Sequence, residues 1–289
     1  MKIGIIGLGL IGGSLGRAIR GMTGSTVYGT DISDAAVAKA ELVGAIDKRL
    51  LDADFSSLDL LIYAVTPRVI LERSENEVKL LKDGTVVLDI AGTKSNVAAK
   101  MKELSVRFPS IEFVAAHPMA GKELSGISAS SAGLFERASI LLVPVKAELA
   151  TLAFVKNFFY RLGFDYVRFT NASEHDKIIA YTSQLPHVLS SCYIGSPTAA
   201  FHHGFSAGSF RDLSRVARMS AGMWAELFTE NKENLIAEID GMIDRLNETR
   251  NLIAAGDEEK LKIILDERSR KKEEIDKADR AWKKDNGKN

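Results

Sequence analysis

The chain opens with the stretch Lys2-Ile3-Gly4-Ile5-Ile6-Gly7-Leu8-Gly9-Leu10-Ile11-Gly12, and this stretch decides the fold of the first half. The β-branched residues before Gly7 predict a short buried strand, and residues 14–22 predict a helix. Gly7 suits a tight turn, Gly9 lets a pyrophosphate approach the backbone, and Gly12 lets helix and strand pack closely. We therefore expect Gly7, Leu8, Gly9, Leu10, Ile11 and Gly12 to bind a dinucleotide at the helix N-terminus.

An acidic residue, Asp31, follows the second predicted strand, which covers residues 25–29. A carboxylate at this position accepts hydrogen bonds from the adenine ribose hydroxyls and repels a 2′-phosphate, so the cofactor is predicted to be NAD rather than NADP. A third predicted strand over 58–64 runs into Val65 and Thr66, which we expect to form a loop over the cofactor.

Composition excludes several classes of function. The 289 residues suit two modest domains, and 38 basic residues balance 38 acidic ones, so nothing favours binding to nucleic acid or to an anionic membrane. No uncharged apolar stretch is long enough to span a membrane, and Arg17 and Arg20 interrupt the N-terminal run that would otherwise resemble a signal peptide. The single cysteine, Cys192, fits a reducing compartment and is interpreted as a small buried hydrophobic residue. We expect a cytoplasmic protein.

The pattern divides the chain near residue 170. Residues 1–170 alternate strands with helices, which predicts an α/β domain with a doubly wound parallel sheet of the Rossmann type. Its later strands are expected over residues 84–90, 111–116, 140–145 and 165–169.

Residues 171–289 lack a strand signal and predict an all-α domain. Its helices are expected over 174–193, 214–228, 232–255 and 257–285, with a solvated charged end from residue 267. Residues 214–228 are expected to form a short 3₁₀-like or helical pair that carries Arg215 to the cleft between the domains. These amphipathic helices are too numerous for one domain face, which favours a homodimer.

His117 follows the predicted strand 111–116, at the edge where the carboxyl ends of parallel strands gather. An imidazole, whose usual pKa is about 6.5, is suited there to take a proton beside a hydride acceptor. The residues alone leave open a structural histidine that bonds the loop backbone.

The segment His117-Pro118-Met119-Ala120-Gly121, placed between a dinucleotide fingerprint and a helical half, resembles the prephenate/arogenate dehydrogenase family. Three more segments match in the order expected of that family. They are Asp89-Ile90-Ala91-Gly92-Thr93-Lys94, residues 175–187, and Phe210-Arg211-Asp212-Leu213-Ser214-Arg215-Val216-Ala217 followed by Met223-Trp224. The resemblance extends from residue 1 to about residue 230.

The resemblance implies an enzyme that oxidatively decarboxylates prephenate to 4-hydroxyphenylpyruvate, or arogenate to tyrosine, with reduction of the dinucleotide. It implies that His117 is the base at the ring hydroxyl and that Arg215 binds a substrate carboxylate. It also implies a dimer through the helical half. Substrate-pocket roles are expected for His187, Lys94, Glu123 and Gln184.

Two positions depart from the family pattern. Gly92 stands where relatives often carry a serine that bonds the catalytic histidine or the substrate, so Thr93 is our candidate for supplying that hydroxyl. Gln184 stands where some relatives have a second histidine. His175 and Asp176 fall near a predicted helix start, where Asp stabilises the first turn, and we place neither in the catalytic set.

Three alternatives stay open. Arogenate dehydrogenase differs only in the substrate side chain. A catalytically silent NAD-sensing protein would need neither His117 nor Arg215. Another hydroxyacid dehydrogenase would commonly use a lysine from the helical domain. No metal site is predicted, since the adjacent His202 and His203 lack metal-ligand spacing.

Overall fold

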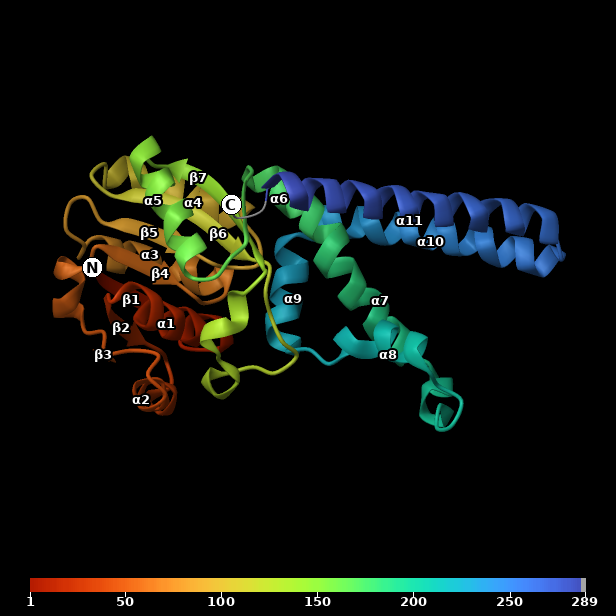
Figure 1. Ribbon diagram of the computed structural model, residues 1–289, viewed down its shortest axis with the longest axis horizontal. Helices are drawn as coiled ribbons and strands as arrows, with labels where there is room; N and C mark the ends of the chain where they lie inside the picture. Colours follow the sequence, from red (N-terminus) through yellow and green to blue (C-terminus); the bar gives the residue numbers. More distant parts are fainter. Residues whose placement is uncertain (287–289) are drawn as a thin grey trace.

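The computed structural model describes residues 1–286 (only the backbone for residues 22 and 23). It consists of an α/β part built on one sheet and a helical part that projects from it (Figure 1). The last strand ends at Phe169, and every later element among the described residues is helical.

A single sheet of eight strands forms the first part, in the order β3-β2-β1-β4-β5-β6-β7-β8. The strands are β1 Lys2–Ile6, β2 Thr26–Thr30, β3 Lys48–Arg49, β4 Leu60–Tyr63, β5 Val86–Asp89, β6 Glu112–Pro118, β7 Ser139–Lys146 and β8 Tyr166–Phe169. The strands from β3 to β6 pair in parallel, as the sequence predicts for a Rossmann-type sheet.

The prediction of an all-parallel sheet is wrong at one edge. β7 runs antiparallel to β6, with His117 opposite Leu141, and β8 then runs parallel to β7. The connection from β6 to β7 contains only the short 3₁₀ turns η2 (Ile127–Ala129) and η3 (Ala132–Phe135). A parallel neighbour would need a crossover to the other end of the sheet, usually through a helix, and no α-helix lies in the described stretch between β6 and β7, so the chain returns in the opposite direction.

Helices cover both faces of the sheet, and successive strand residues feed two separate cores. Ile5 packs in a core on one face of the sheet, with helices α1, α2 and α5, whereas Ile6 packs in a second core on the other face, with helices α3 and α4. This alternation follows from the two-residue period of a strand. The helices are α1 Leu10–Thr23, α2 Asp34–Leu42, α3 Pro67–Val78, α4 Ser95–Arg107 and α5 Leu149–Arg161, with the 3₁₀ turn η1 Asp52–Ser57.

The helical part begins with a helix that is continuous through a π turn. The elements are α6 Ala172–Ile179, the π turn η4 Ala180–Gln184, α7 Leu185–Ile194, η5 Pro197–Phe201, α8 Gly208–Ser214, η6 Arg215–Ala217, α9 Ala221–Glu230, α10 Lys232–Ala255 and α11 Glu258–Asn286. Pro186 has no N–H to bond the preceding turn, and the wider π turn just before it accommodates this loss.

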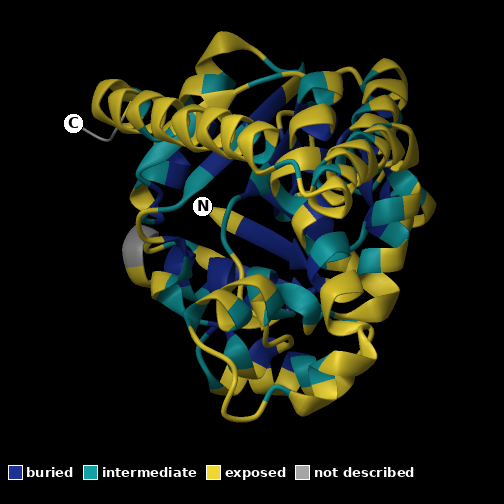
Figure 2. Ribbon diagram, turned by 90° about the vertical axis from the view of Figure 1, so that its right-hand side faces the viewer, coloured by how far each residue is buried: buried dark blue, intermediate teal, exposed yellow. Residues whose placement is uncertain are grey.

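The two longest helices, α10 and α11, form a hairpin that extends away from the sheet (Figure 1). Gly256 turns the chain between them in the left-handed conformation, with φ of +65°. Near its end α11 returns to the sheet, where the Trp282 ring packs 5.4 Å from that of Tyr166 in β8. Most of α11 is exposed in the single chain (Figure 2).

One expectation for the helical part is confirmed and one is wrong. Residues 214–228 form a 3₁₀ turn followed by a helix, as the expected short pair requires, because Arg218 adopts an extended conformation between η6 and α9. This break leaves Arg215 in a 3₁₀ turn. Cys192, expected to be buried, is exposed on α7, and a lone cysteine carries no periodicity that would predict which side of the helix it faces. Within residues 1–286, no helix combines the length and the apolar character needed to cross a membrane.

Candidate active site

The glycine loop between β1 and α1 has the geometry of an anion cradle. Gly7 has φ of +93°, and a Cβ on Gly12 would lie 1.9 Å from the carbonyl oxygen of Gly7. A Cβ on Gly9 would meet nothing within 4 Å, so the space beside it is open. Gly9 begins the helix without a side-chain cap and no acidic residue occupies the first turn. The helix N-terminus can therefore receive a pyrophosphate.

Asp31 lies against this loop, as the ribose assignment requires. Its carboxylate accepts hydrogen bonds from the backbone N–H of Leu8 at 2.8 Å and of Ser33 at 2.9 Å. Val65 lies beside Gly7, and Thr66 precedes α3 as its N-cap. These groups follow the neighbouring strands β2, β1 and β4, so they meet at one edge of the sheet and fit a bound NAD.

Replacing Asp31 by serine should narrow the preference for NAD over NADP by about tenfold, because a charge-assisted hydrogen bond is lost and a repulsive charge is removed. The measurement is kcat/KM with each cofactor. Asp34→Ser is the matched control, since the Asp34 side chain is exposed and pairs with Arg49. An unchanged cofactor ratio in Asp31→Ser would show that Asp31 does not contact the ribose.

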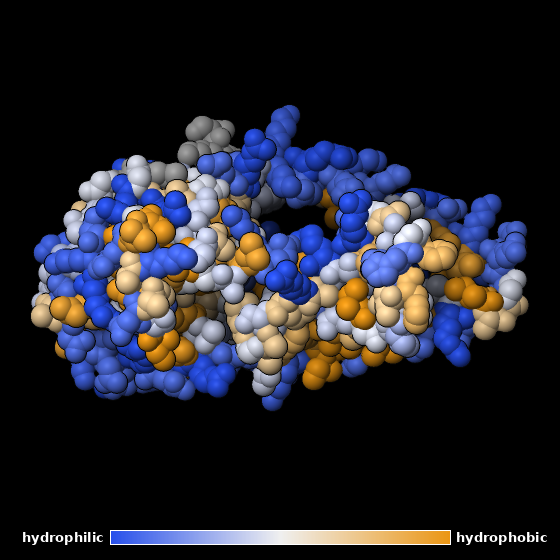
Figure 3. Space-filling view, turned by 90° about the horizontal axis from the view of Figure 1, so that it is seen from below, coloured by the Kyte–Doolittle hydropathy of each residue, from blue (hydrophilic) through white to orange (hydrophobic). Residues whose placement is uncertain are grey.

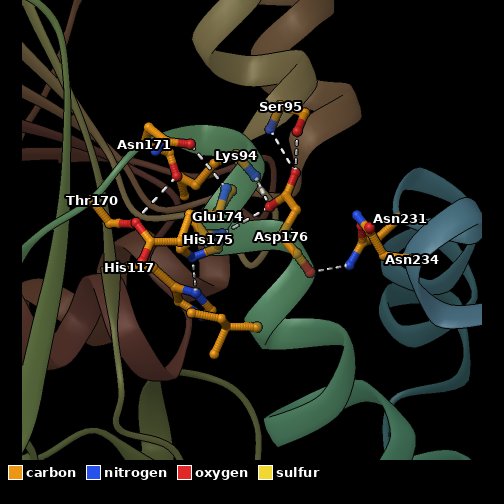
Figure 4. A network of polar contacts seen from close by, with 12 residues as sticks. Lys94, Ser95, His117, Thr170, Asn171, Glu174, His175, Asp176, Asn231 and Asn234 are labelled. Carbon is orange, nitrogen blue, oxygen red and sulfur yellow. Dashed lines mark hydrogen bonds and ion pairs between the residues drawn. The ribbon is translucent and has the colours of Figure 1, made fainter. Parts of the chain in front are cut away.

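His117 lies near the end of β6, where the sequence places it, and its nearest polar partner is another histidine. Its Nδ1 is 2.9 Å from Nε2 of His175, and this contact joins α6 to the sheet (Figure 4). Burial, together with the nearby His175 and Lys94, holds the pKa of His117 well below its usual value of 6.5. His117 is thus neutral at neutral pH and is able to accept a proton.

The lowered pKa of His117 has a consequence for stability. Between the pKa of the folded state and 6.5, the unfolded chain binds more protons, so the free energy of unfolding falls as the pH drops below 6.5. His117→Asn should reduce this slope by up to about 1.4 kcal/mol per pH unit. Urea unfolding across this pH range measures it, with exposed His203→Asn as the control for removing an imidazole. Equal slopes in the parent, His117→Asn and His203→Asn would contradict a lowered pKa for His117.

Asp176 anchors the histidine pair to the start of α4. Its carboxylate lies 2.8 Å from Nδ1 of His175 and accepts hydrogen bonds from the backbone N–H groups of Lys94 and Ser95, each at 2.8 Å, and from the Ser95 hydroxyl (Figure 4). Burial opposes its charge, but these donors hold the pKa of Asp176 below its usual value. The first helix of the helical part is therefore fixed to the sheet at this point.

Lys94 and Thr93 take places that differ from the expected ones. The Lys94 ammonium is fully buried and paired with Asp89, so it supports the loop instead of facing a substrate. Thr93 is also buried, and within residues 1–286 its hydroxyl makes no hydrogen bond to His117. A Cβ on Gly92 would lie 3.1 Å from the Leu227 side chain, so a serine at this position would require that side chain to move by a few tenths of an ångström.

Arg215 and Glu123, both predicted substrate-pocket residues, contact each other. Nη1 of Arg215 donates to Oε1 of Glu123 at 2.6 Å, and both side chains are largely exposed. His187 stacks on Trp224 with ring centroids 3.7 Å apart and donates from Nδ1 to the carbonyl oxygen of Ser183. Burial and the nearby Arg215 lower the pKa of His187. The structure thus brings an arginine and a histidine together on the helical side.

Gln184 lies inside the protein. Its amide nitrogen donates to the carbonyl oxygen of Leu227 at 3.0 Å, and its amide oxygen accepts from Asn231 at 2.8 Å. With both polar atoms satisfied and the residue buried, Gln184 ties the π turn to α9 and α10.

Sequence reasoning missed the parts played by His175, Asp176 and Trp224. The first two stand at the start of the quoted segment 175–187, and Trp224 stands in the motif after Arg215. The signal available in the sequence was a histidine followed by an aspartate near the start of a predicted helix. Position within a helix cannot show that their partner lies 58 residues earlier in the chain.

A dinucleotide-binding α/β domain followed by a helical domain, with a histidine on one and an arginine on the other, defines a two-domain NAD-dependent dehydrogenase. Two family models match this chain. Residues 15–167 match the nucleotide-binding domain of prephenate dehydrogenase, and residues 171–267 match its dimerization domain. The chain belongs to the prephenate dehydrogenase family of oxidoreductases.

Individual relatives agree with this placement. A prephenate dehydrogenase of Lactococcus lactis is 31% identical over 92% of this chain and 75% of its own length. A cyclohexadienyl dehydrogenase of Zymomonas mobilis is 29% identical over 88% and 89%. The solved prephenate dehydrogenase of Aquifex aeolicus, in complex with hydroxyphenyl propionate and NAD⁺, superposes with a TM-score of 0.83 at 27% identity, covering 95% of this chain and 98% of that one.

Proposed function

We propose that this protein uses NAD to convert prephenate to 4-hydroxyphenylpyruvate and CO₂, the oxidative step toward tyrosine. The observation that carries the proposal is His117, a neutral imidazole at the same edge of the sheet as the glycine loop. The similarity to the prephenate dehydrogenase of Lactococcus lactis supports the same reaction.

The chemistry asks little of the protein beyond orientation and one proton transfer. NAD, when bound, supplies the acceptor for the hydride that leaves the ring carbon bearing the hydroxyl. His117 takes the hydroxyl proton as this happens. Loss of the ring carboxylate as CO₂ then restores an aromatic ring, and the proton held by His117 can return to the phenolate oxygen.

Arg215 supplies the cationic contact that a dianionic substrate needs. Its side chain is 64% exposed and its guanidinium is paired with Glu123, so a substrate carboxylate can replace that partner. His187, fixed on Trp224, lies on the same side and offers Nε2 to the substrate. Neither contact distinguishes prephenate from arogenate, because the two substrates differ only in a keto or amino group.

The test is NADH formation by the purified protein with prephenate and with arogenate at equal concentrations. We expect a clear rate with prephenate. A rate with arogenate alone would keep the mechanism and change the substrate. If neither gives NADH while NAD still binds, the NAD-sensing alternative becomes the better reading.

We also propose that the protein is a homodimer through its helical part. Ile236, Ile243, Leu246 and Ile253 lie along α10 at helical spacing, and each is exposed in the single chain. Figure 3 shows hydrophobic side chains gathered over this projecting part. An apolar stripe of this length needs a covering surface.

Light scattering should therefore give twice the mass of one chain. Replacing Ile243 and Leu246 together by glutamate should shift the protein toward monomer, because each chain would bury two negative charges in the proposed dimer interface. Asp244→Asn, an exposed change on the same helix, is the control. A double variant that keeps the parent mass would place the interface elsewhere.

A further inference from the structure

We propose that His175 and Asp176 are positioning residues that fix which ring nitrogen of His117 carries its proton. The inference rests on the proposed role of His117 as base and extends it to a series of three side chains, Asp176 and His175, which are buried, and His117, which is partly buried (Figure 4). Neither His175 nor Asp176 is expected to touch the substrate.

The direction of the series is set at Asp176. Its carboxylate can only accept, and its other contacts, the backbone N–H groups of Lys94 and Ser95 and the Ser95 hydroxyl, are all donors. Nδ1 of His175, 2.8 Å from this carboxylate, must therefore carry a hydrogen and donate it. A neutral imidazole has one N–H, so Nε2 of His175 is left with a lone pair.

The same argument then applies to His117. Nε2 of His175 lies 2.9 Å from Nδ1 of His117, and a lone pair at the first atom requires an N–H at the second. The side chains of His175 and Asp176 are 0% and 2% exposed, so water does not compete for these bonds. The proton of neutral His117 is thus on Nδ1, and its Nε2 has the lone pair that a base needs. The reverse tautomer would set two lone pairs against each other.

The series also stabilises His117 after it has taken a proton. The imidazolium keeps its Nδ1–H on His175, and His175 keeps its own Nδ1–H on the Asp176 carboxylate, so a negative charge lies behind the positive one. Lys94 opposes a positive charge on His117, while Asp89, its ion-pair partner, favours one on His175. Asp176 supplies the carboxylate that is hydrogen-bonded directly to the histidine pair.

The first experiment determines the tautomers in the parent protein and uses a variant only to assign the signals. Protein labelled with ¹⁵N-histidine, with the His117 signals assigned by their loss in His117→Asn, shows directly which ring nitrogens are protonated at neutral pH. We expect the proton of His117 on Nδ1 and that of His175 on Nδ1. A proton on Nε2 of His117 would overturn the proposal, whatever the enzyme's substrate is.

The second experiment removes the anchor. Asp176→Asn introduces an N–H donor, which allows the reverse tautomers, so the spectrum should show a proton on Nε2 of His117 in part of the molecules. With prephenate, kcat should fall by about 10- to 100-fold while the KM for NAD changes little. Ser95→Ala is the matched control, since it removes a hydrogen bond to the same carboxylate but leaves the acceptor in place.

The outcomes separate the two proposals. A fall in kcat with unchanged tautomers in Asp176→Asn would mean that Asp176 acts only by holding α4 and α6 together, and the inference fails. Tautomers as expected in a protein that gives no NADH from prephenate would leave this inference standing and remove the proposed function.

Discussion

His117→Asn should lower kcat with prephenate by roughly 10²- to 10⁴-fold. Asparagine is close in size and can keep a hydrogen bond to Nε2 of His175, but it has no lone pair basic enough to take the proton of the ring hydroxyl. The Kd for NAD should stay near the parent value, because the glycine loop and Asp31 lie on other strands. Steady-state rates and NAD titration by fluorescence measure the two effects.

The control for this variant is His187→Asn, which removes the other histidine of the pocket. It should act mainly on the KM for prephenate, since His187 is assigned to a substrate contact. If His117→Asn turns over at the parent rate, a different group takes the proton, and the proposal that His117 at the end of β6 is the base is wrong.

Arg215→Ala should raise the KM for prephenate by roughly 10- to 100-fold, with a smaller effect on kcat. A guanidinium–carboxylate contact made equally in the ground state and the transition state changes binding more than turnover. The pair that Arg215 makes with Glu123 does not oppose this, because an ion pair between exposed groups contributes only about 0–1 kcal/mol.

Glu123→Gln separates the two partners of that pair. It removes the carboxylate that competes for Arg215, so it should leave the KM for prephenate equal to or below the parent value. The expected split for Arg215→Ala would be refuted by an equal loss in kcat and in kcat/KM, which would place the arginine contact in the transition state alone.

The sheet was predictable where the signal was local. The β1 run, the glycine loop and Asp31 specify one supersecondary unit within some thirty residues, and the structure has it in the expected register. The direction of β7 was not predictable in this way. It depends on the chain between β6 and β7 having no crossover helix, and the turns η2 and η3 carry no periodicity that would reveal their path.

The site was predictable as a set of residue types and less so as a set of contacts. His117 and Arg215 stand in the motifs that the sequence displays, but their partners come from distant segments. Lys94 and Gln184 belong to the same motifs, yet both are buried with their polar groups occupied by the protein. A motif records that a residue is needed without recording whether it faces the ligand or supports the fold.

The most direct test of the account is a product balance for the parent and His117→Asn, with prephenate and NAD supplied together. The parent should form NADH, CO₂ and 4-hydroxyphenylpyruvate in equal amounts as prephenate disappears, and His117→Asn should form all three far more slowly in the same ratio. NADH without CO₂, or no NADH from the parent while NAD still binds, would contradict the account.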